Sequence, residues 1–117
     1  MAATGIAFTM YPVSNVPRAV AFYRDVLGLS QSGLESEHWV EFEAGSGTFG
    51  IADFEQAGAP GSAQSLALEI LDLAGFRKRL SAHGVDSSEP YAMKSCSISV
   101  VRDPDGNQVW LHERKPR

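Results

Sequence analysis

Cysteine, positive charge and long apolar runs are all scarce in this sequence, and each shortage excludes a class of protein. Cys96 is the only cysteine, so no disulfide can form within the chain. The 14 acidic residues outnumber the 10 basic ones, and a formal charge of −4 disfavours a general nucleic-acid binder, which needs a basic face. No apolar run approaches the roughly 20 residues of a membrane-spanning helix. The first residues do not resemble a secretory signal, so we expect a cytoplasmic protein with no nucleic-acid or membrane partner.

The composition that remains is typical of a globular domain. Of the 117 residues, 44% are hydrophobic and 21% are charged, which excludes a disordered chain and suits one packed core. We therefore expect a single domain over residues 1–117.

The clearest local prediction is a helix over residues 15–27. Ser14 or Asn15 is a suitable N-cap, Pro17 fits the first turn, where its missing N–H would be unpaired anyway, and Gly28 suits the position after the last turn. Apolar side chains also recur at helical spacing, at Val16, Val20, Tyr23 and Leu27. The sequence therefore predicts a helix that packs one face against a sheet.

The same order of elements occurs twice along the chain. In the first half a β-prone segment precedes the helix and three follow it, around residues 29–34, 38–43 and 48–54. In the second half a strand at 65–71 leads into a helix that Asp72 caps and Gly84 ends, and a weaker strand at 85–91 follows. The two halves begin about 57 residues apart, on either side of a loop rich in Gly, Ala and Pro.

This repeat predicts an α+β fold built from two βαβββ modules. The modules cover about residues 5–54 and 65–113, and residues 55–64 link them. Two such units can form one curved mixed sheet with two helices outside and a central cleft inside. An independent, ferredoxin-like pair of sheets is an alternative arrangement of the same elements.

A hairpin completes the second module. Asp103-Pro104-Asp105-Gly106 is a turn sequence, because proline presets φ, aspartate bonds neighbouring N–H groups and glycine accepts a positive φ. β-prone segments flank this turn at 97–101 and 109–111.

Two segments of the chain resemble the vicinal oxygen chelate superfamily. The first runs from Tyr11 to Leu29 and contains the capped helix with its Phe-Tyr and Leu-Gly-Leu motifs. The second is the hairpin from Val101 to Asn107. This superfamily includes glyoxalases, bleomycin-resistance proteins, fosfomycin-resistance enzymes and extradiol dioxygenases. The resemblance covers roughly residues 6–113. It implies the curved-sheet fold, and it also implies a homodimer in which the ligand groove is shared between two chains.

Metal-dependent members of that superfamily place four His, Glu or Gln ligands on the inner sheet face. The resemblance assigns these positions here to Phe8, Ile51, Ser65 and Trp110. Only the serine carries an oxygen, and a neutral hydroxyl is a weak ligand for a divalent ion. We therefore expect no metal site at these positions and no cofactor.

Strand alternation extends these four positions into a candidate ligand-binding cleft, since residues two apart face the same side of a strand. The expected lining is aromatic and partly acidic. It consists of Phe8, Met10, Trp39, Glu41, Phe49, Ile51, Ser65, Glu69, Trp110 and His112. Aromatic faces beside carboxylates suit planar or cationic organic molecules. The same aromatics could instead simply fill the core of a small domain.

Three functions remain open from the sequence. The first is a metal-free protein that binds a small aromatic or cationic organic molecule. The second is a metal-dependent lyase or dioxygenase that uses a shifted ligand set, Glu41, Glu69 and His112, and would need a divalent metal. The third is an interaction module without a small ligand. Among the titratable residues, His112 is the best candidate for a general acid or base.

Overall fold

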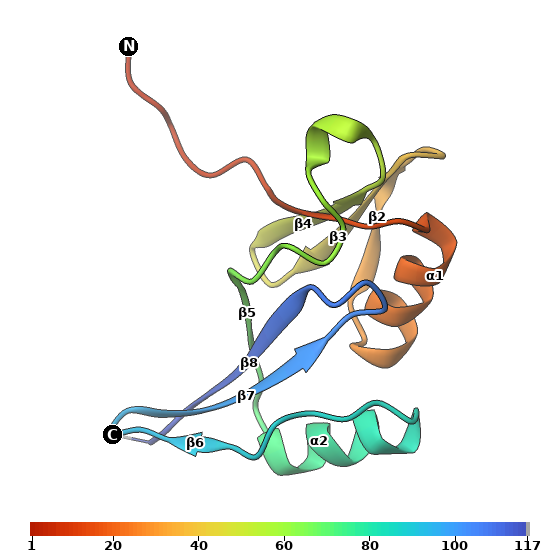
Figure 1. Ribbon diagram of the computed structural model, residues 1–117. Helices are drawn as coiled ribbons and strands as arrows, with labels where there is room; N and C mark the ends of the chain where they lie inside the picture. Colours follow the sequence, from red (N-terminus) through yellow and green to blue (C-terminus); the bar gives the residue numbers. More distant parts are fainter. Residues whose placement is uncertain (117) are drawn as a thin grey trace.

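Each half of the chain folds into one four-stranded mixed sheet with a helix packed on one face (Figure 1). The computed structural model describes residues 1–116. In the first module, β1 (Thr9–Pro12) leads into the first helix, and β2 (Ser30–Glu35), β3 (Trp39–Ala44) and β4 (Gly47–Ala52) follow. The strands lie in the order β1-β4-β3-β2, so the first strand pairs in parallel with the last.

The second module repeats this topology. It consists of β5 (Leu66–Glu69), helix α2 (Leu73–Ala82), β6 (Tyr91–Ala92), β7 (Cys96–Arg102) and β8 (Gln108–Arg114), in the order β5-β8-β7-β6. The predicted α+β fold of two βαβββ modules is confirmed. Hydrogen bonds divide the eight strands into two sheets of four, called here sheet A and sheet B, instead of joining them into one sheet.

The first helix begins as predicted and then widens. Asn15 caps α1 (Val16–Val20) by accepting the Arg18 N–H at 2.9 Å, and Pro17 occupies its first turn. The chain continues without a break into η1 (Ala21–Val26), which is π-helical. Arg79 of α2 donates to the carbonyl oxygens of Val26 and Asp25 at the end of η1, which satisfies groups that a helix terminus leaves free.

Two smaller elements differ from the sequence-based expectation. Residues 55–57 of the linker form the short 3-10 helix η2 (Glu55–Ala57). The predicted strand at 85–91 is reduced to a bridge between Ser87 and Val101 and to β6 at its end. The reason is that the Ser88 hydroxyl accepts the Val100 N–H at 2.9 Å, and a side chain thereby replaces a ladder bond.

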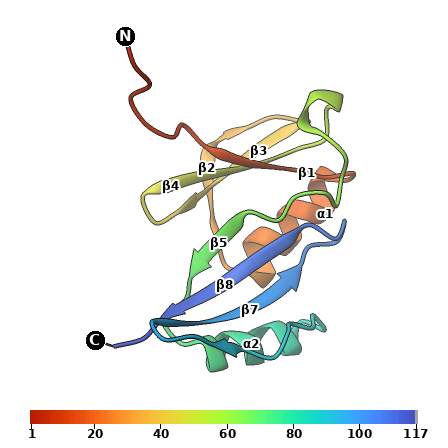
Figure 2. The same ribbon diagram turned by 60° about the vertical axis from the view of Figure 1, so that its left-hand side comes forward.

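One hydrophobic core is shared by both modules, and it forms where the two helices pack against the sheets. Its largest fully buried members come from both sheets and both helices, and they are Tyr11, Tyr23, Phe42, Phe49, Ile51, Leu80 and Leu111. Figure 2 shows α1 on the lower side of sheet A and α2 below sheet B. Neither α1 nor α2 covers the opposite, outer face of its sheet.

Polar contacts join the modules at the edge of this core. The Asp103 carboxylate is buried and accepts the Tyr23 hydroxyl at 2.8 Å and the Asn107 amide at 2.8 Å. The Asn107 amide also donates to the Pro12 carbonyl oxygen at 2.8 Å. Burial, followed by the charge of Asp103, raises the pKa of Tyr23 well above its ordinary value, so its hydroxyl remains a donor. The predicted Asp-Pro-Asp-Gly turn is therefore also one of the contacts between the modules.

Among residues 1–116, no helix has the length and apolar character needed to cross a bilayer.

Candidate functional site

The outer face of sheet A carries an aromatic cluster. Trp39 of β3 meets the Phe8 ring edge-on, with ring centroids 5.0 Å apart, and stacks nearly parallel on Phe54 at 6.0 Å. Phe8 is 46% exposed and Phe54 is 39% exposed, so two of the three rings present much of their surface to solvent. This aromatic cluster, Phe8–Trp39–Phe54, is the first half of the candidate site.

A glycine and a glutamate fix the position of the indole. Gly50 pairs with Glu41 across β3 and β4, and a Cβ placed on Gly50 would lie 2.9 Å from Cζ2 of Trp39. Only glycine therefore lets the indole lie flat against the sheet at this point. On the same face, Trp39 Nε1 donates to Glu41 Oε2 at 2.9 Å, which holds the carboxylate beside the rings.

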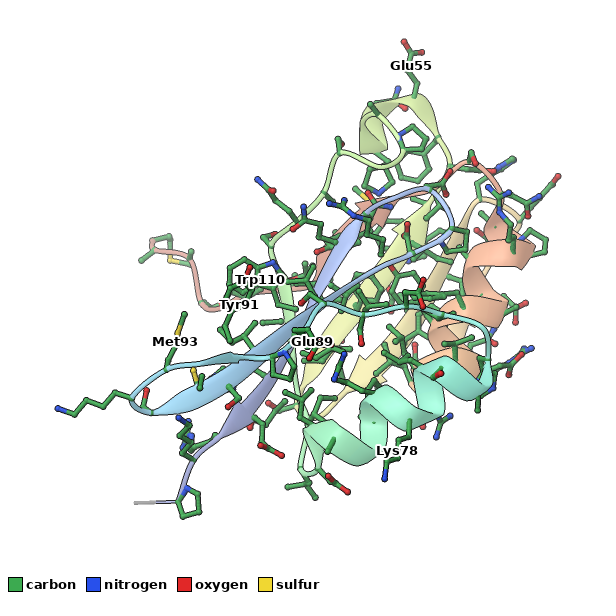
Figure 3. The ribbon with its side chains drawn as sticks, turned by 60° about the horizontal axis from the view of Figure 1, so that its bottom comes forward. Glu55, Lys78, Glu89, Tyr91, Met93 and Trp110 are labelled. Atoms are coloured by element: carbon green, nitrogen blue, oxygen red, sulfur yellow. The ribbon has the colours of Figure 1, made fainter. Side chains whose placement is uncertain are left out.

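The outer face of sheet B carries a second, different surface. Trp110 of β8 is 39% exposed and Tyr91 of β6 is 64% exposed. Figure 3 shows Tyr91, Met93 and Trp110 on the side of β7 and β8 away from α2, whose Lys78 points in the opposite direction. Pairing aligns Tyr91, Ile98, His112 and Glu69 in one row across the four strands of sheet B.

His112 and Glu69 form a hydrogen-bonded pair within that row. His112 Nδ1 lies 2.5 Å from Glu69 Oε1, and Glu69 Oε2 accepts the backbone N–H of Arg114 at 3.0 Å. The Arg114 N–H, followed by His112, holds the pKa of Glu69 below its ordinary value. The ionised carboxylate therefore accepts a hydrogen bond from the Nδ1–H group, which leaves Nε2 of the imidazole as an acceptor in that tautomer.

The structure separates the predicted cleft residues into three groups. Those on the outer face of sheet A are Phe8, Met10, Trp39 and Glu41, and those on or beside the outer face of sheet B are Ser65, Glu69, Trp110 and His112. Phe49 and Ile51 are 1% and 0% exposed and belong to the core. The two outer faces belong to two separate sheets of one chain.

The position of Phe49 and Ile51 corrects the predicted register of β4 by one residue. Ile51 and Trp110 each stand four residues after a turn glycine, Gly47 and Gly106, but the turns differ in length. Two residues separate Ala44 from Gly47, whereas five separate Arg102 from Gln108. A shift of one residue moves every side chain of a strand to its other face, so Gly50 stands where Ile51 was expected.

Gly50, Phe54 and Tyr91 are site residues that sequence reasoning missed. The sequence does contain a pattern that predicts the side of Gly50. In β4 the large residues Phe49 and Ile51 alternate with the small residues Gly50 and Ala52. Large apolar residues of a strand belong on its core side, so Gly50 faces outward. Phe54 follows the same parity as Gly50. The two-residue strand of Tyr91 gave no comparable pattern.

The positions that correspond to metal ligands do not fit a divalent ion. After the register correction they hold Phe8, Gly50, Ser65 and Trp110, and only the serine hydroxyl offers an oxygen. Within residues 1–116 no group of three or more His, Cys, Asp or Glu side chains gathers as a metal site would require. The alternative set is not brought together either, because Glu41 lies on sheet A whereas Glu69 and His112 lie on sheet B.

Another hollow, of about 910 Å³, lies between the β3–β4 turn and the segment from β5 to α2. Its walls are mostly apolar, and its charged groups are already engaged. Asp72 accepts the Gly75 N–H at 3.0 Å, Arg79 binds the end of η1, and Glu69 holds His112. Binding sites orient their ligands with a few convergent, free polar groups, so we assign the site to the outer faces instead.

Comparison with solved structures places this arrangement among known proteins. The chain is 25% identical to the antibiotic-binding protein TnmS3 from Streptomyces sp. CB03234, with a TM-score of 0.85 over 98% of this chain and 99% of that one. It is also 25% identical to a glyoxalase/bleomycin resistance protein from the same organism, with a TM-score of 0.79 over 92% and 98% of the two chains. Lactoylglutathione lyase from Agrobacterium tumefaciens is 23% identical, with a TM-score of 0.79 over 97% and 96%, and shows a shared fold.

Comparison with the curated proteins finds no match. The sequence model of one family matches residues 5–111, which is nearly the whole chain. That match agrees with the capped helix after β1, the Asp-Pro-Asp-Gly turn and the repeated βαβββ topology. The chain belongs to the Glyoxalase/Bleomycin resistance protein/Dioxygenase superfamily.

Proposed function

We propose that this protein binds a planar aromatic or cationic organic molecule, without a metal ion, on the outer faces of its sheets. The observation that carries the proposal is the cluster Phe8–Trp39–Phe54 with the Glu41 carboxylate held against it. Exposed aromatic rings add nothing to the core, and their stacked arrangement offers a flat apolar surface to a planar ligand. A carboxylate beside that surface favours a positive charge on the ligand.

Similarity to solved structures supports a binding protein over an enzyme. TnmS3, at 25% identity over almost its entire length, is described as an antibiotic-binding protein. The unsuitable donors at the four metal-ligand positions support the same choice, because the lyase and dioxygenase alternative needs a divalent ion.

We further propose that the binding protein is a homodimer. The outer faces of sheets A and B carry complementary parts of a site but stand apart in one chain. Residues 1–54 contain two basic and six acidic residues, a net charge of −4, whereas residues 65–117 contain eight basic and seven acidic residues, a net charge of +1. A two-fold dimer that places sheet A of one copy opposite sheet B of the other would join unlike charges and cover the exposed aromatics.

Binding of the planar cation 9-aminoacridine, followed by quenching of tryptophan fluorescence, tests the proposed function. We expect Trp39→Ala to weaken binding at least tenfold and Glu41→Gln to weaken it about two- to fivefold, since an exposed cation–π or charge contact contributes about 0.5–1 kcal/mol. Glu55→Gln is the matched control. Glu55 is an exposed carboxylate on η2 that points away from both sheets (Figure 3), so this change should leave binding unaltered.

The same preparation tests the other two parts of the proposal. Sedimentation at micromolar concentration should show a dimer, and a monomer at all concentrations would contradict the shared site. Elemental analysis after dialysis should show no stoichiometric metal. A bound ion that is lost in Glu69→Gln or His112→Gln would favour the metalloenzyme instead.

A further inference from the structure

The His112–Glu69 pair has a geometry that stacking alone does not require. Its carboxylate is held at both oxygens, by the imidazole at 2.5 Å and by the Arg114 N–H at 3.0 Å, so the imidazole has a fixed tautomer and a fixed orientation. A carboxylate behind a histidine makes the other ring nitrogen a better proton acceptor, because the negative charge stabilises the imidazolium that forms.

Nearby groups suit a negative charge in front of that nitrogen. A hollow of about 440 Å³ beside His112 is lined by Lys94, Ser95, His112, Arg114, Lys115 and Pro116. Three of these six residues are cationic, although the whole chain is acidic. Lys115 also donates to the Met93 carbonyl oxygen, which holds its ammonium group beside the turn between β6 and β7. An anion that forms next to His112 would therefore lie in a locally positive environment.

A flat apolar surface adjoins the same pair. Trp110 precedes His112 by two residues on β8, so both side chains stand on the outer face, with their Cα atoms about 7 Å apart. Pairing places Ala67, a small residue, beside Trp110 on β5. A ring that stacks on the indole can therefore direct a substituent towards His112.

We infer that the His112–Glu69 pair accepts the proton of an acidic hydroxyl group on an aromatic ligand that stacks on Trp110, so that the protein holds this ligand as its phenolate. The inference rests on the proposed function and names one class of ligand for it. The ligand O–H bond breaks, a bond forms between that proton and His112 Nε2, and no other group is consumed. The imidazolium is then paired with Glu69, and the phenolate oxygen accepts the new Nε2–H.

Charged and titratable groups surround His112 on each neighbouring element. The charged ones are Glu69 on β5, Arg114 and Lys115 at the end of β8, and Lys94 in the β6–β7 turn. The phenol of Tyr91 on β6 is the remaining titratable group. Glu69 favours the protonated imidazole. The three cations disfavour it and favour the phenolate. Together these groups stabilise the ion pair that the proton transfer forms, which consists of the His112 imidazolium and the ligand phenolate.

A matched pair of probes separates proton acceptance from stacking. 7-Hydroxycoumarin and 7-methoxycoumarin have the same rings, but only the first has an acidic hydroxyl, and its absorption band shifts when the proton leaves. We expect both to bind, and we expect the apparent pKa of the bound hydroxycoumarin to fall by about one unit or more below that of the free probe. His112→Gln and Glu69→Gln should each remove this shift from the hydroxycoumarin that binds.

His83→Gln is the control variant, because His83 lies at the end of α2, where its ring contacts the Arg79 carbonyl oxygen at 2.9 Å. It should retain the full shift. If both coumarins bind equally and the bound hydroxycoumarin keeps its free pKa, the inference is wrong while aromatic binding stands. If neither coumarin nor 9-aminoacridine binds to the unaltered protein, the proposed function fails and the inference fails with it.

Discussion

The two faces of each sheet follow opposite rules. On the inner faces, large apolar side chains are fully buried, and the polar groups between the modules are paired with one another. On the outer faces, aromatic side chains remain exposed, and carboxylates lie beside them. The difference indicates that the inner faces determine folding. Under the proposed function the outer faces bind the ligand, so changes to the two faces should separate stability from ligand affinity.

The outer faces also differ from each other although their topology is the same. When the two sheets are aligned by their strand pairing, Gly50 of sheet A is equivalent to Trp110 of sheet B. In the same way Glu41 is equivalent to Val100, and Ala52 to His112. Each outer face thus carries one indole, but on strands that are not equivalent. In sheet A, Gly50 leaves room for the Trp39 indole of β3. In sheet B, Trp110 of β8 occupies the position equivalent to Gly50. Sheet A presents a carboxylate beside its indole, whereas sheet B presents a histidine backed by a carboxylate.

The largest expected effect comes from the inner side, at Asp103. Asp103→Ala would leave the buried Tyr23 hydroxyl and the Asn107 amide without their shared acceptor. We expect the free energy of unfolding to fall by about 3–5 kcal/mol, because several charge-assisted bonds are lost and their donors stay buried. Urea denaturation measures the change, and Asp86→Ala, at an exposed aspartate of the same module, is the control. Equal losses in the two variants would show that the contact between the modules is unimportant for stability.

A smaller effect is expected on the outer side, at Gly50. Gly50→Val should force the Trp39 indole off the sheet, since even a Cβ would approach it to 2.9 Å. We expect affinity for 9-aminoacridine to fall about tenfold, whereas stability should change by less than about 1 kcal/mol, because the strand preference of valine offsets part of the strain. Gly33→Val in β2 is the matched control, as nothing lies within 4 Å of a Cβ at that position. Unaltered binding by Gly50→Val would remove Trp39 from the site.

These contrasts also explain how far the sequence alone could lead. The capped helix, the Asp-Pro-Asp-Gly turn and the repeated order of elements depend on local chemistry, so the fold class was predictable from Asn15, Pro17 and Gly106. The register of β4 was not, because it depends on the length of the turn between Ala44 and Gly47, which differs from that of the second hairpin. The π-helical turn at Ala21–Val26 was also missed, since six residues are too few to distinguish it from an α-helix by periodicity.

The candidate site was predictable in its chemistry and less so in its assembly. Alternation correctly placed Trp39 with Glu41, and Trp110 with His112, on shared faces. It could not show that the two pairs stand on separate sheets, because that depends on how the modules pack. The contacts that determine this packing involve residues far apart in sequence, such as the Tyr11 hydroxyl, which donates to the Gln108 carbonyl oxygen at 2.6 Å.

The smallest expected effect concerns pH and the pair on sheet B. The pKa of Glu69 is lowered in the folded protein, first by the Arg114 N–H and then by His112, so the unfolded chain binds more protons at this residue in acid. Its contribution to stability is therefore present above the ordinary glutamate pKa of about 4.3 and is lost as the pH falls through the lower, folded value. Glu69→Gln removes the titrating group, so its urea midpoint should differ from that of the unaltered protein at pH 7 and converge with it in acid.

Because the Glu69 side chain is largely exposed, solvent screens the pair and the difference should be small. If the urea midpoints of Glu69→Gln and the unaltered protein differ by the same amount at pH 7 and in acid, the charge of Glu69 does not contribute to stability.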